Sequence, residues 1–293
     1  MEGYHRSVLL KETIEALGVK EGSWYLDCTL GDGGHSLEIL KQGGKVAGLD
    51  VDPLALERAK ERLKELGEFK LIAGNFRDIK NLIQQTELKD QKFAGAIFDL
   101  GVSSLQLESP ERGFSFAKMG PLDMRMDPNL QIRALDFVNN LSRKELYELF
   151  KNLGEEKYSR SLADALVLAR QVKPFESTID FADAVKRAIG FRREKINPAT
   201  RVFQALRIAV NDELNALKEG LDQVRDLIEK NGLILVISFH SLEDRIVKTT
   251  LRDWQLSGLG KKVNKKPIVP SDWEIAENPR SRSAKLRIVK YIN

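Results

Sequence analysis

The chain has 293 residues, 42% of them hydrophobic, which is enough to bury the core of one large or two ordinary domains. Its single cysteine, Cys28, excludes an intrachain disulfide and a cysteine-based metal cage, and three scattered histidines do not suggest a zinc site, so no metal is expected. The formal net charge of +4 is uneven, because residues 245–290 hold 12 Lys and Arg against 4 Asp and Glu. This basic region suggests a polyanionic partner about as readily as an ordinary solvated surface.

No apolar run approaches the ~20 residues of a membrane span, and the charged N-terminal region does not resemble a signal peptide. We therefore expect a cytoplasmic protein. Residues 7–17 predict a short first helix with Ser7 as a candidate N-cap.

A predicted strand at 24–28 leads into a turn that holds Gly31, Gly33 and Gly34, and a helix resumes at about 35–41. Glycines allow positive φ angles and close approach of a ligand to the backbone. The free N–H groups at the start of the following helix favour an anionic group. We interpret this segment as a ligand-binding turn rather than an ordinary strand-to-helix connection.

The second predicted strand, 45–50, ends at Asp50, 19 residues after Gly31. A doubly wound sheet places at this point the acid that binds ribose hydroxyls. Asp52 and Pro53 are typical of the N-cap and first residue of a helix, so Asp52 is expected to be structural. The turn has a serine where the dinucleotide fingerprint has its third glycine, which favours a cofactor with one adenosine, such as S-adenosylmethionine, over NAD.

Four further strands are predicted, at about 69–73, 93–100, 233–238 and 285–292. The first is followed by Phe76, which could pack on an adenine ring or in the core. The second ends at Asp99, and a carboxylate after a fully apolar run is costly unless it serves a site. The third closes at His240. Because the carboxyl ends of parallel strands share one edge, the sequence predicts an α/β fold with a mostly parallel, doubly wound sheet and a site at that edge.

The middle of the chain changes character. Residues 108–141 predict an ordered loop of the kind that often forms a lid, and residues 142–189 predict helices alone. The basic segment 191–201 connects them to a further long helix, and residues 257–270 predict a mobile basic loop. We expect a helical domain at 111–207, inserted between residues 1–110 and 208–293 of the α/β domain. Candidates for phosphate contacts are Arg192, Arg193, Arg201, Lys261, Lys262, Lys265, Lys266, Arg280 and Arg282.

Several segments together carry a family resemblance: H-R-S-V-L-L-K-E, D-C-T-L-G-D-G-G-H-S, G-L-D-V-D-P, D-L-G-V-S-S-L-Q-L, G-P-L-D-M-R-M-D-P, N-P-A-T-R-V-F-Q-A-L-R, S-F-H-S-L-E-D-R and N-P-R-S-R-S. In these segments the sequence resembles the bacterial 16S ribosomal RNA cytosine-N4 methyltransferases of the MraW/RsmH type. The resemblance spans nearly the whole chain. It implies a class I methyltransferase domain interrupted by a helical domain that helps to bind RNA, with S-adenosylmethionine as cofactor.

The resemblance also implies methyl transfer to the N4 amine of a cytidine in the decoding region of 16S rRNA, with the small ribosomal subunit as partner. The cofactor contacts expected from the turn and from the family motifs are Gly31, Gly33, Gly34, His35, Asp50, Phe76, Asp99 and Gln106. A cytosine amine is a poor nucleophile, so the enzyme must hold it in line and accept its N–H hydrogen bonds. Asp99 or the hydroxyls of Ser103 and Ser104 lie where such an acceptor belongs, and His240 could assist or be structural.

Two alternatives remain open from the sequence. One is a non-catalytic RNA-binding or ribosome-assembly factor that keeps a cofactor pocket. The other is an NAD-dependent oxidoreductase, which shares the turn and the acid but has the third glycine that this chain lacks.

Overall fold

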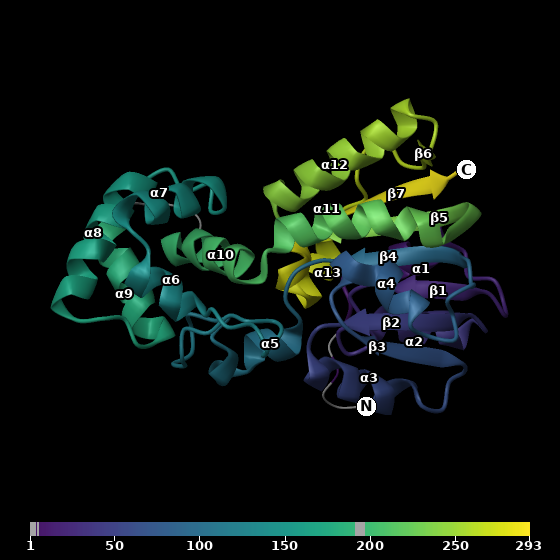
Figure 1. Ribbon diagram of the computed structural model, residues 1–293, viewed down its shortest axis with the longest axis horizontal. Coiled ribbons are helices and arrows are strands. Elements are labelled where there is room, and N and C mark those ends of the chain that lie inside the picture. The colour runs from purple at the N-terminus through teal and green to yellow at the C-terminus, as the bar shows by residue number, and fades with distance from the viewer. Residues whose placement is uncertain (1–3, 5, 191–196) are drawn as a thin grey trace. The chain divides into compact units, whose positions relative to one another are not determined.

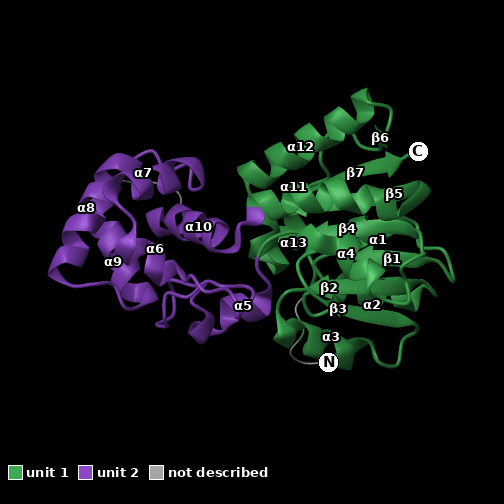
Figure 2. Cartoon of the chain, viewed as in Figure 1, with its two compact units in different colours: residues 1–101, 214–293 green, residues 102–213 purple. Residues whose placement is uncertain are grey.

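The computed structural model describes residue 4, residues 6–190 and residues 197–293. The chain divides into two compact units (Figures 1 and 2). The sheet unit comprises Met1–Gly101 and Leu214–Asn293, and the helical unit comprises Val102–Glu213. The helical segment is therefore wider than the 111–207 that we expected from the sequence. Among the described residues, no helix is both long and apolar enough to cross a lipid bilayer.

The sheet unit is built on seven strands in the order β3-β2-β1-β4-β5-β7-β6. They are β1 (Trp24–Asp27), β2 (Lys45–Asp50), β3 (Phe69–Ala73), β4 (Phe93–Asp99), β5 (Ile228–Ser238), β6 (Gly260–Lys262) and β7 (Lys285–Tyr291). Strands β1 to β5 are parallel, and β7 is antiparallel to both β5 and β6. The predicted mostly parallel, doubly wound sheet is confirmed. Its strand order reverses between β1 and β4, which is where such sheets open a crevice for ligands.

Helices cover both faces of this sheet (Figure 1). They are α1 (Leu10–Leu17), α2 (Gly34–Lys41), α3 (Pro53–Leu63), α4 (Ile79–Gln84), α11 (Glu213–Val224), α12 (Ser241–Leu256) and α13 (Asp272–Glu277), with 3-10 turns η1 (Phe76–Asp78), η3 (Arg225–Leu227) and η4 (Pro279–Ser283). Successive residues of β4 alternate between two apolar clusters. Ala96 and Phe98 pack with α4, α11 and α12, whereas Ile97 packs with α1, α2 and α3. Burial on both faces explains why these strands are continuous apolar runs.

Several boundaries differ from the prediction because long-range pairing sets them. Strand β5 begins at Ile228 rather than 233, and Asn231, expected to end a helix, lies inside the strand with φ 70°. Strand β6 forms within the predicted mobile loop because its residues pair with β7. Helix α1 begins at Leu10 after Leu9 at φ 52°, so Ser7 is not its cap. The predicted cap of α3 is confirmed, since Asp52 accepts a hydrogen bond from the Leu54 N–H at 3.1 Å.

The helical unit contains α5 (Ser104–Glu108), η2 (Pro110–Arg112), α6 (Ala134–Asn140), α7 (Arg143–Asn152), α8 (Ser159–Val172), α9 (Thr178–Ile189) and α10 (Pro198–Asn211). These elements share one apolar core, in which Phe150, Phe181 and Leu206 are fully buried. The long helix expected after residue 201 is split, because Asp212 adopts φ 49° and ends α10.

The loop before α6 is ordered by contacts within the helical unit. The side chain of Asn211 donates to the Met124 carbonyl at 2.8 Å and accepts from the Met126 N–H at 2.7 Å. Gly113 has φ 70°, and a Cβ at this position would lie 2.1 Å from the Pro121 carbonyl oxygen. The G-P-L-D-M-R-M-D-P segment is therefore explained in part by packing, since its backbone is fixed onto α10.

Candidate active site

The glycine turn connects β1 to α2 and has the conformation that its sequence requires. Gly31 and Gly33 adopt φ 54° and 79°. A Cβ on Gly31 would meet no atom within 4 Å, so the missing side chain leaves open space beside the backbone. At Gly34, the first residue of α2, a Cβ would lie 2.0 Å from the Ser7 hydroxyl oxygen. A side chain at 34 would therefore have to displace the Ser7 side chain of the N-terminal segment, whereas at 31 the absence of a side chain leaves open space beside the turn.

Asp50 fixes this turn to the end of β2. Its Oδ2 accepts a hydrogen bond from the Gly31 N–H at 2.8 Å, and its Oδ1 accepts from the Asp52 N–H at 2.9 Å. Burial raises the pKa of the Asp50 carboxyl to about 6, although these two N–H groups oppose the shift. Each carboxylate oxygen can accept more than one hydrogen bond, so Asp50 retains capacity for ribose hydroxyls while it holds the turn.

Asp27, at the end of β1, is a site residue that sequence reasoning missed. Its side chain is buried, and its Oδ2 accepts a hydrogen bond from the Ser36 hydroxyl at 2.7 Å. This bond anchors the first turn of α2. Burial raises the pKa of the Asp27 carboxyl, while the charge of His35 and the bonds from Ser36 and Thr29 lower it. The signal was present in the sequence, because Asp27 is an acid at the end of an apolar strand, as are Asp50 and Asp99.

His35 and Asp99 are brought together at this edge. The His35 Nε2 lies 3.4 Å from the Asp99 Oδ2, close enough for charge attraction but without hydrogen-bond geometry. Burial lowers the pKa of His35, but the carboxylates of Asp99 and Asp27 outweigh it and raise the pKa overall. Both His35 ring nitrogens and the Asp99 Oδ1 are buried without a hydrogen-bond partner among the described residues. Buried polar atoms normally have partners, so these atoms fit a polar ligand at this edge.

Two backbone features place Asp99 and Phe76. The Asp99 N–H donates to the Thr29 hydroxyl oxygen at 2.6 Å, which ties the end of β4 to the end of β1. Phe76 follows β3 and meets the ring of Phe98 edge-on at 5.5 Å. A Cβ on Gly220 of α11 would lie 2.6 Å from the Phe76 ring. Phe76 therefore packs against the core on one side, and its adenine contact stays a prediction.

Ser103 and Gln106 belong to the helical unit, where they form a reciprocal cap on α5. The Ser103 hydroxyl oxygen accepts from the Gln106 N–H at 3.2 Å, and the Gln106 side-chain oxygen accepts from the Ser103 N–H at 3.1 Å. The S-S-L-Q sequence carries this signature, because a serine followed three residues later by glutamine is a capping box. Both side chains thus have a local structural role.

His240 caps α12 in the sheet unit. Its Nδ1 accepts from the Glu243 N–H at 3.4 Å, and its Nε2 lies 3.0 Å from the Glu243 Oε1. Glu243 in turn accepts from the Phe239 N–H at 2.8 Å. Both side chains are buried, so the structure gives His240 a positioning role at the end of β5.

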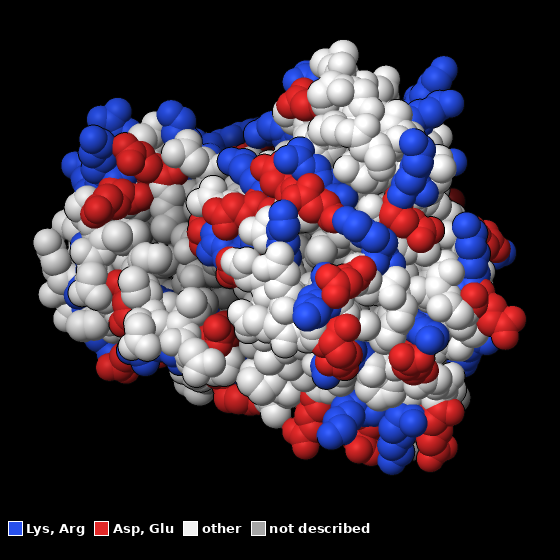
Figure 3. Space-filling view, turned by 45° about the vertical axis from the view of Figure 1, so that its right-hand side comes forward, with Lys and Arg blue, Asp and Glu red and all other residues white. Residues whose placement is uncertain are grey.

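The basic candidates that the structure describes differ in their surroundings. Figure 3 shows Lys and Arg interleaved with Asp and Glu on the visible face. Lys265, Lys266, Arg280 and Arg282 are exposed, whereas Arg201 lies 3.5 Å from the buried Glu156. Arg192 and Arg193 lie outside the described residues.

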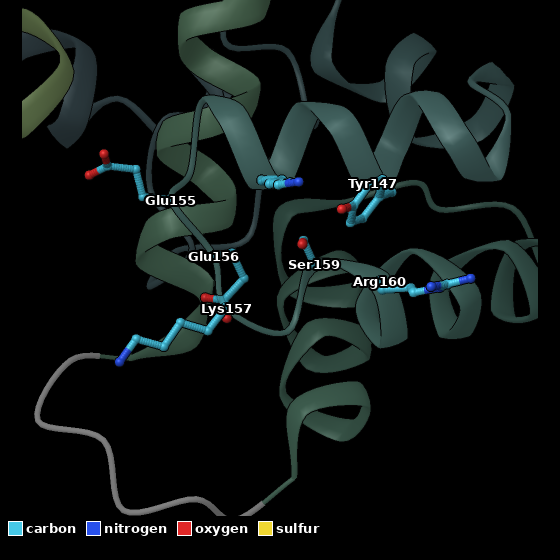
Figure 4. Close-up of a pocket in the computed structure, with 7 residues that line it drawn as sticks. Tyr147, Glu155, Glu156, Lys157, Ser159 and Arg160 are labelled. Carbon is cyan, nitrogen blue, oxygen red and sulfur yellow. The ribbon is translucent and has the colours of Figure 1, made fainter.

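The helical unit also has a surface hollow of about 410 Å³ between α7 and α8 (Figure 4). Tyr147, Lys151, Glu156, Ser159 and Arg160 are among the residues that line it, and no predicted site residue does. Figure 4 shows the Arg160 and Lys157 side chains directed away from each other. The hollow therefore does not bring these two cations together.

The strand order, the glycine turn before α2, and the acids that end β1, β2 and β4 define a class I methyltransferase. The family model of the MraW methylases matches residues 2–292, and the chain belongs to this family. The expected methyltransferase class and S-adenosylmethionine dependence are thereby confirmed. The NAD-dependent alternative is set aside.

Curated relatives cover almost the full chain. Three proteins named ribosomal RNA small subunit methyltransferase H are similar to it. That of Carboxydothermus hydrogenoformans is 46% identical, over 100% of this chain and 99% of the relative. That of Halothermothrix orenii is 43% identical, over 98% of each, and that of a Sulfurihydrogenibium species is 46% identical, over 98% of this chain and 99% of the relative.

Proposed function

We propose that this chain transfers a methyl group from S-adenosylmethionine to the N4 amine of a cytidine in the decoding region of 16S rRNA. The names of its relatives support the small-subunit rRNA as substrate, and the family resemblance of the sequence supports the position. The observation that carries the reaction type is the state of Cys28. Methylation at the C5 carbon of a pyrimidine uses a cysteine nucleophile, but the only thiol of the chain, that of Cys28 directly after β1, is 2% exposed in the apolar core, and burial raises its pKa well above the ordinary value.

The residues at the sheet edge fit this cofactor. The backbone of Gly31 borders open space, and Asp50 offers carboxylate oxygens beside it for ribose hydroxyls. The buried His35 nitrogens have no partner among the described residues and can meet the charged amino-acid end of the cofactor. When bound, S-adenosylmethionine supplies an electrophilic methyl group. We propose Gly33, Gly34 and Phe76 as further contacts, from the family motifs.

Asp99 is the acceptor that we propose for the amine N–H groups. It ends β4 at the switch point, and its side chain is 21% exposed. Its Oδ1 has no hydrogen-bond partner among the described residues, so it can accept an amine N–H as charge develops on the amine. Ser103 and His240 are already engaged as helix caps, so the proposal gives them no proton transfer. Gln106 supports the segment after Asp99 through the same cap.

We further propose that the helical unit helps to recognise the RNA, and that the protein acts in the cytoplasm, where small ribosomal subunits are assembled. Arg201 of the helical unit and the exposed basic residues of the sheet unit are the candidates for phosphate contacts.

The test is transfer of a labelled methyl group from S-adenosylmethionine to unmethylated small subunits and to free 16S rRNA, with the product nucleoside identified by mass spectrometry. N4-methylcytidine at a single decoding-region position is expected. Methylation at a ring carbon or at another base would contradict the proposal. Cofactor binding without any incorporation would favour the non-catalytic alternative.

A further inference from the structure

Trp273 is unusual among the three tryptophans of this chain. It lies in α13 and is 59% exposed, whereas Trp254 is 4% exposed. The Arg6 guanidinium lies 4.7 Å from the centre of the Trp273 ring system. An arginine on an exposed indole forms a flat cationic and aromatic surface, which we call the Trp273 platform (Arg6 and Trp273).

The platform is held in place by buried contacts. The Glu274 side chain is 8% exposed, and its Oε1 accepts from the Leu9 N–H at 2.7 Å. The Asn278 side chain donates to the Arg6 carbonyl at 3.5 Å. These contacts join the segment before α1 to α13 and η4, more than 260 residues later in the chain. The Trp273 ring is therefore presented on a fixed support rather than on a free terminus.

The platform is also adjacent to the cofactor turn. Ser7 follows Arg6 directly and packs on Gly34, where a Cβ would lie 2.0 Å from its hydroxyl oxygen. On the other side, η4 leads into β7, whose first residue, Lys285, pairs with Ser238 at the carboxyl end of β5. Both connections place the platform at the edge of the sheet that carries Asp50 and Asp99.

We propose that the Trp273 platform stacks an unpaired base of the RNA next to the target cytidine. This inference rests on the proposed function, since it concerns the same substrate. Single-stranded RNA is recognised by bases stacked on aromatic rings and arginine planes. Charge attraction alone does not explain the surface, because Asp272 and Glu277 are exposed on α13 beside Arg280 and Arg282 of η4. A stacking contact accounts for an exposed indole in this mixed-charge setting.

The chemistry favours RNA over another protein as occupant. A base that flanks the target must lie near the cofactor edge once the target cytidine has left its stack. The platform offers one indole and one guanidinium rather than an extended apolar area. That size fits a single base, whereas a stable protein interface requires a much larger buried surface.

The experiment compares Trp273→Ala, Trp273→Phe and Arg6→Ala with the wild type on small subunits and on a decoding-region RNA fragment. Trp273→Ala should raise KM for the RNA substrate, and Kd for the fragment, roughly 5- to 100-fold, the range for loss of one stacked base. KM for S-adenosylmethionine should stay within about twofold. Trp273→Phe should recover most of the affinity because a smaller ring still stacks. Leu256→Ala, which removes another exposed apolar side chain at 78% exposure, is the matched control and should have no effect.

A complementary readout is tryptophan fluorescence. The RNA fragment should quench the fluorescence of the wild type saturably, and most of this quenching should be lost in Trp273→Phe. Wild-type KM for the RNA in Trp273→Ala would overturn the platform, as would an equal rise in KM for the cofactor, which would indicate a structural role. A defect seen only with whole subunits, without fragment quenching, would assign the contact to a ribosomal protein and overturn it too. If the wild type itself methylates no small-subunit RNA, the proposed function fails instead.

Discussion

Replacement of Asp50 by asparagine removes the negative charge of the side chain that joins the glycine turn to β2 and keeps its size. The native carboxylate accepts two backbone N–H groups, from Gly31 and Asp52, and an amide oxygen can accept only one of them. Hydrogen bonds to a charged group contribute about 1.5–3 kcal/mol each. We therefore expect Asp50→Asn to weaken S-adenosylmethionine binding roughly 10- to 100-fold at pH 7.5, through the turn and through the ribose contact together.

The raised pKa of Asp50 makes this effect depend on pH. With a folded-state pKa of about 6 against an ordinary 3.8, ionisation costs the ligand-free protein about 3 kcal/mol. The protonated carboxyl therefore contributes about 3 kcal/mol to the free energy of unfolding. This contribution is fully present below about pH 4 and is lost as the pH rises through about 6. The affinity for the cofactor should instead rise with pH, because the ionised carboxylate is the form that accepts the ribose hydrogen bonds. At pH 5 only about a tenth of Asp50 is ionised, so the Kd of the wild type for the cofactor should be roughly 10-fold higher than at pH 7.5.

Isothermal titration with S-adenosylmethionine from pH 5 to pH 8, and urea unfolding of the ligand-free protein over the same range, test this reasoning. Asp50→Asn should remove the part of the pH dependence of both measurements between pH 5 and 7 that Asp50 contributes, and leave the part that His35 and Asp27 contribute. Asp52→Asn, which keeps an acceptor for the α3 cap, is the matched control and should preserve that dependence. A variant that binds the cofactor within about twofold of the wild type at pH 7.5 would refute the role of Asp50.

Four further substitutions test catalysis and structure separately. Asp99→Asn should lower the single-turnover rate of methyl transfer about 100-fold or more, and a wild-type rate would remove Asp99 from the reaction. His240→Asn keeps a helix-capping side chain, so methyl transfer should stay within a few fold of the wild type and stability should fall by about 1 kcal/mol in urea unfolding; a large loss of rate would instead restore His240 to catalysis. Gly113→Ala should cost more than about 2 kcal/mol because its Cβ would meet the Pro121 carbonyl, whereas Gly18→Ala, also at positive φ but in open space, should cost about 1 kcal/mol; equal costs would contradict the contact.

The elements that the sequence predicted well are those with local signals. Strands β1 to β4 are apolar runs that end at turn residues or acids, and their ends fall within a residue of the expected positions. The α3 start was readable because Asp52 and Pro53 specify a helix N-terminus without help from distant residues. The same locality explains why Gly31, Asp50 and Asp99 could be proposed as neighbours, since parallel strands bring their carboxyl ends to one edge.

The features that were missed depend on partners far away in the sequence. Strand β6 forms only because β7 lies beside it, and β5 extends back to Ile228 because Phe93 of β4 pairs there. Ser7 packs against Gly34 instead of capping α1, and no local sequence pattern indicates this contact. The capping role of Ser103 was missed, and that of His240 was held only as an alternative, for another reason. Their capping patterns are local, but a functional interpretation of the same residues competed with them.

The site uses backbone groups on the cofactor side and is expected to use side chains on the RNA side. The cofactor turn is set by glycine conformations and by acids that bind backbone N–H groups, so it needs few exposed side chains. The RNA side must supply selectivity, yet the net charge is only +4 and the visible face mixes both signs (Figure 3). A protein that bound RNA mainly by neutralising phosphates would carry a broader basic surface. We therefore expect recognition to depend on a few directed contacts, such as those that we propose for Asp99 with the amine and for the Trp273 platform with a neighbouring base.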